Sequence, residues 1–244
     1  MIKCIFMTTI AMLSLQLWAD DNNHYHQEEM IESFELVQVV ETPGGLEYEI
    51  PLGSQKKPDF INLSNSNPVS VVGDLKDIIM MTKDLIALGK EIYKIIEAGK
   101  PVVTVSTAPI EILPRDEAGA LIDAFQLENW KEPVSVKYRV KAKNYLGMNP
   151  IVFEFIVIFT YGGSYNGHGA YITGAQIKPT NLDVLWGFDF SAEFKVQTIM
   201  NQGTSVDPIA GAVLSLDYKV NTVFQDRQQS KMFFINGHGK ITAY

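Results

Sequence analysis

The chain has 244 residues, of which 46% are hydrophobic and 20% charged, and its 20 Lys and Arg against 28 Asp and Glu give a formal net charge of −8. This acidic balance, without a dense basic cluster, excludes the charge distribution that nucleic-acid partners require, and it gives no attraction to anionic lipid headgroups. A single cysteine cannot form a disulfide framework, so stability must come from a packed core.

The first 19 residues have the order of a secretory signal peptide. Lys3 precedes an apolar run at 5–17, and Ala19 is followed by an acidic, amide-rich stretch that suits cleavage after Ala19. The apolar run is shorter than the roughly 20 residues that a membrane-spanning helix needs. We therefore expect an exported protein that is periplasmic, on the outer surface or extracellular. The absence of cysteine beyond Cys4 favours a bacterial envelope or secretome.

Residues 20–70 are expected to form an N-terminal arm and linker ahead of the main domain. Two strands are predicted within them, at 34–40 and 46–50, with a Pro-Gly-Gly turn between them. The second strand alternates apolar with acidic residues, as a half-buried strand does, and the two are expected to pair as a hairpin. The stretch 51–68 is rich in Pro, Gly, Ser, Asn and Lys, which predicts a long connector.

Residues 74–98 have the spacing of an amphipathic α-helix. Apolar side chains recur at alternating intervals of three and four residues, which places them on one face, and lysines recur every seven residues on the opposite face. Asp74 can cap the start, and Gly99 followed by Pro101 ends the segment. The pattern predicts one long helix whose apolar face packs against the core. That face consists of Ile78, Met81, Leu85, Leu88, Ile92 and Ile95.

After this segment the hydrophobic pattern changes to a period of two residues. Residues 134–143, 190–196 and 214–220 alternate apolar with polar side chains, as antiparallel strands with one buried face do. Residues 102–107 are mostly β-branched, and 151–161 are almost wholly apolar. Both compositions favour strands, and the second is typical of a strand covered on both faces.

These elements predict a mainly β protein. Strands separated by Gly, Pro and Asn turns, without regular alternation of strand and helix, favour an antiparallel β-sandwich or open barrel. We expect this domain at 71–244, with the one long amphipathic α-helix packed against it. A further short helix is expected within 116–129.

The tetrapeptide Asn-Gly-His-Gly occurs twice, at 166–169 and at 236–239. Asn-Gly is the preferred centre of a tight hairpin turn because both residues tolerate positive φ, so two hairpin turns are predicted. The alternative is that His168 and His238 converge at one end of the sandwich on a polar ligand or a metal. No third ligand accompanies either histidine at metal-binding spacing, so no metal site is predicted.

Three tyrosines surround the first copy of this tetrapeptide. Tyr161, Tyr165 and Tyr171 lie beside several glycines, a composition typical of loops that contact carbohydrates or peptides. These tyrosines with His168 are the predicted ligand-binding residues, and His238 is expected nearby if the two turns share an end. The ligand is an unidentified protein or carbohydrate. The alternative is that the rings pack at the sheet edge while the glycines relieve crowding.

No catalytic or cofactor-binding motif is present. Neither histidine of the main domain adjoins a Gly-x-Ser-x-Gly turn, and Gly-His-Gly-Lys at 237–240 lacks the glycine spacing and the following Ser or Thr of a phosphate loop. Paired carboxylates that meet only in space leave no spacing to detect. We therefore predict a protein that is not an enzyme, with no catalytic residues and no cofactor.

In this chain an amphipathic segment is followed by strands, and this order of parts resembles that of pore-forming proteins of the actinoporin type. In those proteins an amphipathic helix precedes a β-sandwich and leaves it to enter a bilayer. The resemblance lies in the order of parts and involves no shared motif. It implies a membrane-active protein in which the apolar face of 74–98 contacts lipid. The four lysines and five acidic residues of that segment give it a net charge of −1, whereas membrane-surface helices are usually rich in lysine.

We therefore expect a non-enzymatic protein with a binding, adhesion or structural role, and a pore-forming protein is the alternative.

Overall fold

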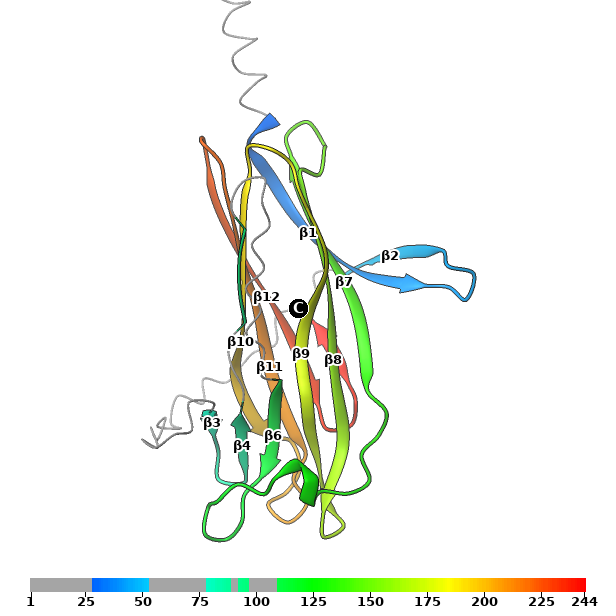
Figure 1. The fold of residues 1–244 in the computed structure, drawn as a ribbon, viewed down its shortest axis with the longest axis vertical. Helices are drawn as coiled ribbons and strands as arrows, with labels where there is room; N and C mark the ends of the chain where they lie inside the picture. The colour runs from blue at the N-terminus through cyan, green and yellow to red at the C-terminus, as the bar shows by residue number, and fades with distance from the viewer. Residues whose placement is uncertain (1–27, 53–77, 89–91, 97–108) are drawn as a thin grey trace, which may run out of the picture.

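The computed structural model describes residues 28–52, 78–88, 92–96 and 109–244, which form two antiparallel β-sheets (Figure 1). The larger sheet has the strand order β2-β1-β7-β8-β9-β6-β4-β3, and the smaller has the order β13-β12-β11-β10-β5. The mainly β, antiparallel fold predicted from the sequence is confirmed. The larger sheet contains β1 (Ile31–Glu41), β2 (Glu47–Pro51), β3 (Ile78–Met81), β4 (Leu85–Leu88), β6 (Ile110–Pro114), β7 (Val134–Asn144), β8 (Ile151–Tyr165) and β9 (His168–Val184). The smaller contains β5 (Ile92–Ile96), β10 (Asp189–Asn201), β11 (Ala210–Asn221), β12 (Asp226–Asn236) and β13 (Ile241–Ala243).

The core lies between the two sheets and is rich in phenylalanine. Phe153 and Phe155 of β8 meet Phe190 and Phe194 of β10 and Phe233 of β12. The ring centroids of Phe153 and Phe190 are 5.3 Å apart, and those of Phe155 and Phe233 are 5.7 Å apart. Aromatic pairs at such distances contribute about 0.5–1.5 kcal/mol beyond the burial of their area. The alternating apolar residues of distant strands thus form one interior.

The long α-helix predicted for 74–98 is wrong for the described residues, which form β3, β4 and β5 there. The seven-residue spacing of the apolar residues explains the error. Ile78, Leu85 and Ile92 each begin a short strand, so a unit made of one strand and its connection also repeats every seven residues. A helix would leave Ile86 and Ala87 off the apolar face, yet both are buried in β4 beside Leu85. Consecutive apolar residues favour a strand that is covered on both faces.

The antiparallel order places alternate connections at opposite ends of the sandwich (Figure 1). The connections β7–β8, β9–β10 and β11–β12 lie at the top of the figure, and we call this the tip end. The connections β3–β4, β8–β9 and β10–β11 and the segment after β6 lie at the bottom, which we call the cleft end. Segments far apart in the sequence therefore meet at each end.

The N-terminal hairpin predicted at 34–40 and 46–50 is confirmed by the antiparallel pairing of β1 with β2. β1 also pairs with β7, and Leu36 belongs to the core. The hairpin turn extends away from the body of the sandwich (Figure 1). Within 116–129 the structure has only a single 3₁₀ turn, η1 (Ala124–Gln126), which Asp123 caps.

Several sequence predictions lie outside the described residues. These are the signal peptide at 1–19, nearly all of the connector at 51–68, and the strand at 102–107. Within the described part of the chain, no helix has the length and hydrophobicity needed to cross a membrane.

Candidate functional site

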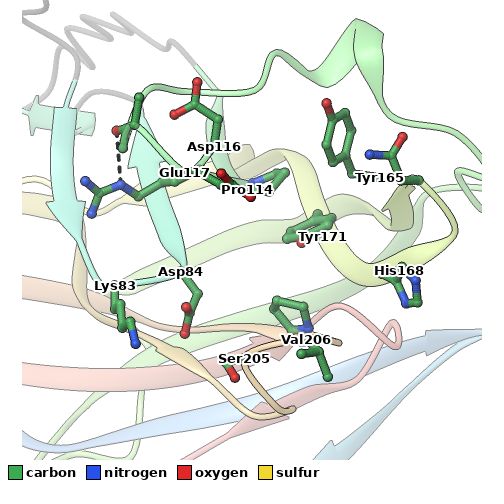
Figure 2. Close-up of a pocket in the computed structure, with 15 residues that line it drawn as sticks. Lys83, Asp84, Pro114, Asp116, Glu117, Tyr165, His168, Tyr171, Ser205 and Val206 are labelled. Carbon is green, nitrogen blue, oxygen red and sulfur yellow. Dashed lines mark hydrogen bonds between the residues drawn. The ribbon is translucent and has the colours of Figure 1, made fainter.

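Four connections at the cleft end surround an open cleft of about 660 Å³ (Figure 2). They are the β3–β4 turn, the segment after β6, the β8–β9 hairpin and the β10–β11 loop. Figure 2 shows Lys83 and Asp84 on one side and Tyr165 and His168 on the other, with Tyr171 between them. The cleft therefore combines residues that lie far apart in the sequence and come from both sheets.

Arg115 joins two of these connections. Its Nη1 donates to the carbonyl of Thr82, at 2.7 Å, and its Nε donates to the carbonyl of Gly119, at 3.1 Å. The guanidinium thus ties the β3–β4 turn to the segment that follows β6. In the same segment Asp116 accepts a hydrogen bond from the backbone N–H of Ala120 at 2.7 Å. These contacts fix the backbone on one side of the cleft.

Asp207 joins the other two connections. Its carboxylate accepts a hydrogen bond from the backbone N–H of Gly169, at 2.7 Å, and the N–H of Ala170 donates to the carbonyl of Pro208, at 2.8 Å. The β8–β9 hairpin of the larger sheet is therefore held against the β10–β11 loop of the smaller sheet. Charge-assisted hydrogen bonds such as the first are stronger than neutral ones, so this side is also firmly positioned.

Asn201 links the two sides. Its Nδ2 donates to Asp84 Oδ2 at 3.3 Å and to the carbonyl of Thr204 at 3.0 Å. Its Oδ1 accepts from the backbone N–H groups of Gly203 and Ile209, at 2.8 and 3.0 Å. One amide side chain thus shapes the β10–β11 loop and positions Asp84 beside it.

Tyr171 forms the floor of the cleft and is 4% exposed. Burial raises the pKa of Tyr171 to about 12, and the nearby carboxylates of Asp207 and Asp84 add to the rise. The phenol therefore keeps its proton at neutral pH and can offer both an O–H donor and an oxygen acceptor. Gly169 leaves room for this ring, because a Cβ at Gly169 would lie 2.4 Å from it.

Three of the five ligand-binding residues predicted from the sequence lie together in the cleft: Tyr165, His168 and Tyr171. Tyr161 does not line it, because its ring packs over Gly239, where a Cβ would lie 2.6 Å from the ring. His238 is exposed but does not line it either. The alternative interpretation, in which glycines make room for packed rings, therefore applies to Tyr161, which packs over Gly239 and does not line the cleft. It applies only partly to Tyr171, which packs over Gly169 and also lines the cleft.

The two Asn-Gly-His-Gly copies form different turns. In the first, Asn166 and Gly167 have φ of 52° and 80°, as a two-residue hairpin turn requires, and Tyr165 pairs with His168. In the second, the side chain of Asn236 accepts hydrogen bonds from the backbone N–H groups of His238 and Lys240. A Cβ at Gly237 would lie 2.0 Å from the carbonyl oxygen of Ala170, so this turn packs tightly on β9.

The other predicted groups are placed as follows. Of the apolar face proposed for membrane contact, Leu85 is buried in the core and Leu88 is half-buried in β4. The remaining members, Ile78, Met81, Ile92 and Ile95, lie in β3 and β5, whose side chains are outside the description. Across the part of the chain that the structure describes, no group of three or more His, Cys, Asp and Glu side chains could hold a metal ion.

Comparison of the chain with protein-family models, with curated proteins and with solved structures finds no match. The function is therefore argued from the residues of this chain alone.

Sequence reasoning missed the charged side of the cleft, which includes Lys83, Asp84 and Arg115. The predicted helix places Lys83 and Asp84 on its solvent face, where a charged side chain needs no functional explanation. The one available signal was the run of four apolar residues at 85–88, which indicates a strand and would have placed Lys83 and Asp84 in a turn.

Proposed function

We propose that the protein is an exported, non-enzymatic binding protein that holds a carbohydrate in the cleft. The observation that carries the proposal is the convergence of Tyr165 and His168 with Lys83 and Asp84 on one concave surface. Small-ligand sites usually have volumes of about 300–1,000 Å³, and this cleft, with about 660 Å³, is of that size. A concave site of this kind suits an oligosaccharide better than the face of a folded protein. Export is supported by the order of residues 1–19.

The chemistry of the lining suits sugar hydroxyls, each of which both donates and accepts hydrogen bonds. Lys83 supplies donors and Asp84 supplies acceptors, while the Tyr171 hydroxyl supplies one of each kind and the His168 imidazole adds two ring nitrogens. The half-buried ring of Tyr165 offers an apolar face for the C–H groups of a pyranose. The site therefore combines polar groups of both kinds with one partly exposed aromatic surface.

The backbone around the cleft is fixed before any ligand arrives. Arg115 and Asp207 each bind two of the four connections together, and Asn201 joins the two sides. A ligand therefore does not have to order these loops, and the affinity is not reduced by that entropy cost.

The test begins with the full chain on an array of immobilised oligosaccharides, followed by calorimetric titration of the sugar that binds most strongly. The double substitution Tyr165→Ala/His168→Ala should weaken binding at least about tenfold, because it removes the aromatic surface and one polar group. The thermal unfolding temperature should fall modestly, because His168 is exposed whereas the Tyr165 ring packs partly against the core, and the titration is carried out well below that temperature.

A matched control replaces the same residue types away from the cleft. Tyr145→Ala/His238→Ala removes one exposed tyrosine and one exposed histidine that do not line the cleft, and it should bind as the wild type does. If the cleft variant and the wild type bind the sugar with equal affinity, the cleft is not the binding site. If no sugar on the array binds the wild type, the proposal of a carbohydrate ligand is wrong. The oligosaccharide should be recovered unchanged, because its cleavage would contradict the non-enzymatic assignment.

A further inference from the structure

The tip end of the sandwich carries exposed apolar side chains on all three of its connections. The β9–β10 connection exposes Leu185 and Trp186, the second of them to 84%. The β11–β12 connection exposes Val223, to 85%, and the β7–β8 connection exposes Tyr145 and Met148. These positions are distant in the sequence, but the antiparallel order brings the three connections to one end of the long axis (Figure 1).

The three tips contain no charged residue. Their sequences are Asn-Tyr-Leu-Gly-Met-Asn at 144–149, Leu-Trp-Gly-Phe at 185–188 and Asn-Thr-Val-Phe-Gln at 221–225, in a chain that is 20% charged. The connections at the cleft end contain Lys83, Asp84, Arg115, Asp116 and Asp207. Exposed charges flank the tips, at Lys143, Asp183, Asp189 and Asp226. The connections themselves are uncharged, so their apolar side chains can enter the edge of an apolar environment while the flanking charges stay hydrated.

Backbone groups at the tips are largely paired within the protein. Asn144 Oδ1 accepts from the N–H groups of Leu146 and Met148, and Thr222 Oγ1 accepts from those of Phe224 and Gln225. In the third tip, the N–H of Leu185 donates to the carbonyl of Pro150 at 2.8 Å. Unpaired backbone groups are costly in lipid, so paired tips with outward apolar side chains are suited to a bilayer interface.

The chain also enters the described fold at the tip end. Asn144 Nδ2 donates to the carbonyl of Glu28 at 2.9 Å, and the backbone N–H of Ile31 donates to Gln225 Oε1 at 2.7 Å. The apolar run at 5–17 precedes this point by ten residues, which span at most about 35 Å when extended. Until cleavage after Ala19, the apolar run engages the membrane during export, and the short stretch that follows it keeps the tip end within that distance of the bilayer.

We infer that the tip end is a bilayer-binding surface that inserts Leu185, Trp186 and Val223 into the interfacial region of a membrane. Aromatic side chains such as Trp186 favour that region, where the ring is apolar and its N–H remains hydrated. Binding is driven by apolar insertion, and the uncharged tips need no anionic lipid. This surface lies opposite the cleft, which would then face away from the membrane.

Co-sedimentation of the mature chain, from Asp20 to Tyr244, with phosphatidylcholine vesicles tests the inference. The substitutions Leu185→Ser/Trp186→Ser/Val223→Ser should lower the partition coefficient at least about tenfold, because three exposed apolar side chains no longer enter the lipid. The chain that begins at Asp20 lacks both the apolar run at 5–17 and Trp18, so neither contributes to partitioning or to fluorescence. The matched control is Phe125→Ser, which removes a 98% exposed aromatic residue from the cleft end and should leave partitioning unchanged.

Quenching by brominated lipids gives a second readout. Wild-type fluorescence should be quenched on binding, and Trp186→Phe should lose most of that quenching while the protein still sediments with the vesicles. The inference is overturned if the wild type does not bind, if it binds only vesicles that contain anionic lipid, or if the triple variant binds equally well. If the wild type does not bind vesicles but forms a dimer, and the triple variant is a monomer, the inference is also overturned. The tip end is then a self-association surface.

Discussion

At the residue scale, Gly169 and Tyr171 show how the backbone makes room for the cleft floor. Gly169 has φ of 84°, and Gly167, two residues earlier in the same hairpin, has φ of 80°. A Cβ at Gly167 would meet no atom within 4 Å, whereas a Cβ at Gly169 would overlap the Tyr171 ring. The two glycines therefore share the same backbone requirement and differ only in what an added side chain would contact.

This difference gives a matched pair of substitutions. Gly167→Ala should cost roughly 1–2 kcal/mol, because it forces alanine into the left-handed region. Gly169→Ala should cost at least about 1 kcal/mol more and displace Tyr171, because it adds a steric overlap to the same strain. Urea unfolding of both variants measures the difference. Equal losses would show that the ring does not depend on the space above Gly169.

At the scale of elements, β2 is held to the sheet by charges that extend across β1. The buried side chains of Val37 and Val39 lie on the same outer face as the basic residues of β7, at 137, 139 and 141. Over these valines, Lys137 Nζ binds Glu47 at 2.6 Å, and both Arg139 and Lys141 bind Glu49. The hairpin is therefore fixed by an ion-pair network as well as by its backbone ladder.

The network makes the hairpin sensitive to acid. Hydrogen bonds from Lys137 and Arg139 lower the pKa of Glu47. Burial alone would raise the pKa of Glu49, but hydrogen bonds from Lys141 and Arg139 outweigh it and lower the pKa. A carboxyl with a lowered folded-state pKa stabilises the fold above its unfolded pKa, of about 4.3, and the stabilisation disappears as the pH falls through the folded-state value.

Glu49→Gln should therefore reduce stability near neutral pH by about 1 kcal/mol or less, and it should make the acid dependence shallower. Amide exchange in β1 and β2, followed as the pH is lowered, measures the effect. Glu132→Gln is the control, because Glu132 is exposed and forms no salt bridge with any other described residue. The same acid dependence in Glu49→Gln and in the wild type would contradict the role of the network.

At the scale of the whole molecule, the sequence predicted the sheets more successfully than the site. Strands with strict alternation, such as 134–143 and 214–220, were identifiable because one buried face imposes a period of two residues. The Asn-Gly turn at 166–167 was identifiable because its φ values restrict the residue types. The segment 74–98 was not, because a repeat of seven residues fits both a helix and a series of short strands.

The cleft was predicted only in part for a related reason. Tyr165, His168 and Tyr171 are neighbours in one hairpin, so their composition identified them together. Lys83 reaches the same cleft only because β4 pairs with β6 and β6 pairs with β9, and such long-range pairings are not visible in a local pattern. The error in the predicted helix therefore also concealed half of the site.

Lys83 consequently provides the most direct test of the account. Its exposed ammonium lines the cleft only if residues 78–88 are two strands joined by a turn, whereas a helix would place it on a solvent face. Lys83→Ala should weaken binding of the array-selected oligosaccharide about tenfold, with unfolding unchanged, because one charged hydrogen-bond donor is lost. Wild-type affinity in Lys83→Ala, measured by the same calorimetric titration, would contradict the claim that the four connections form one binding site.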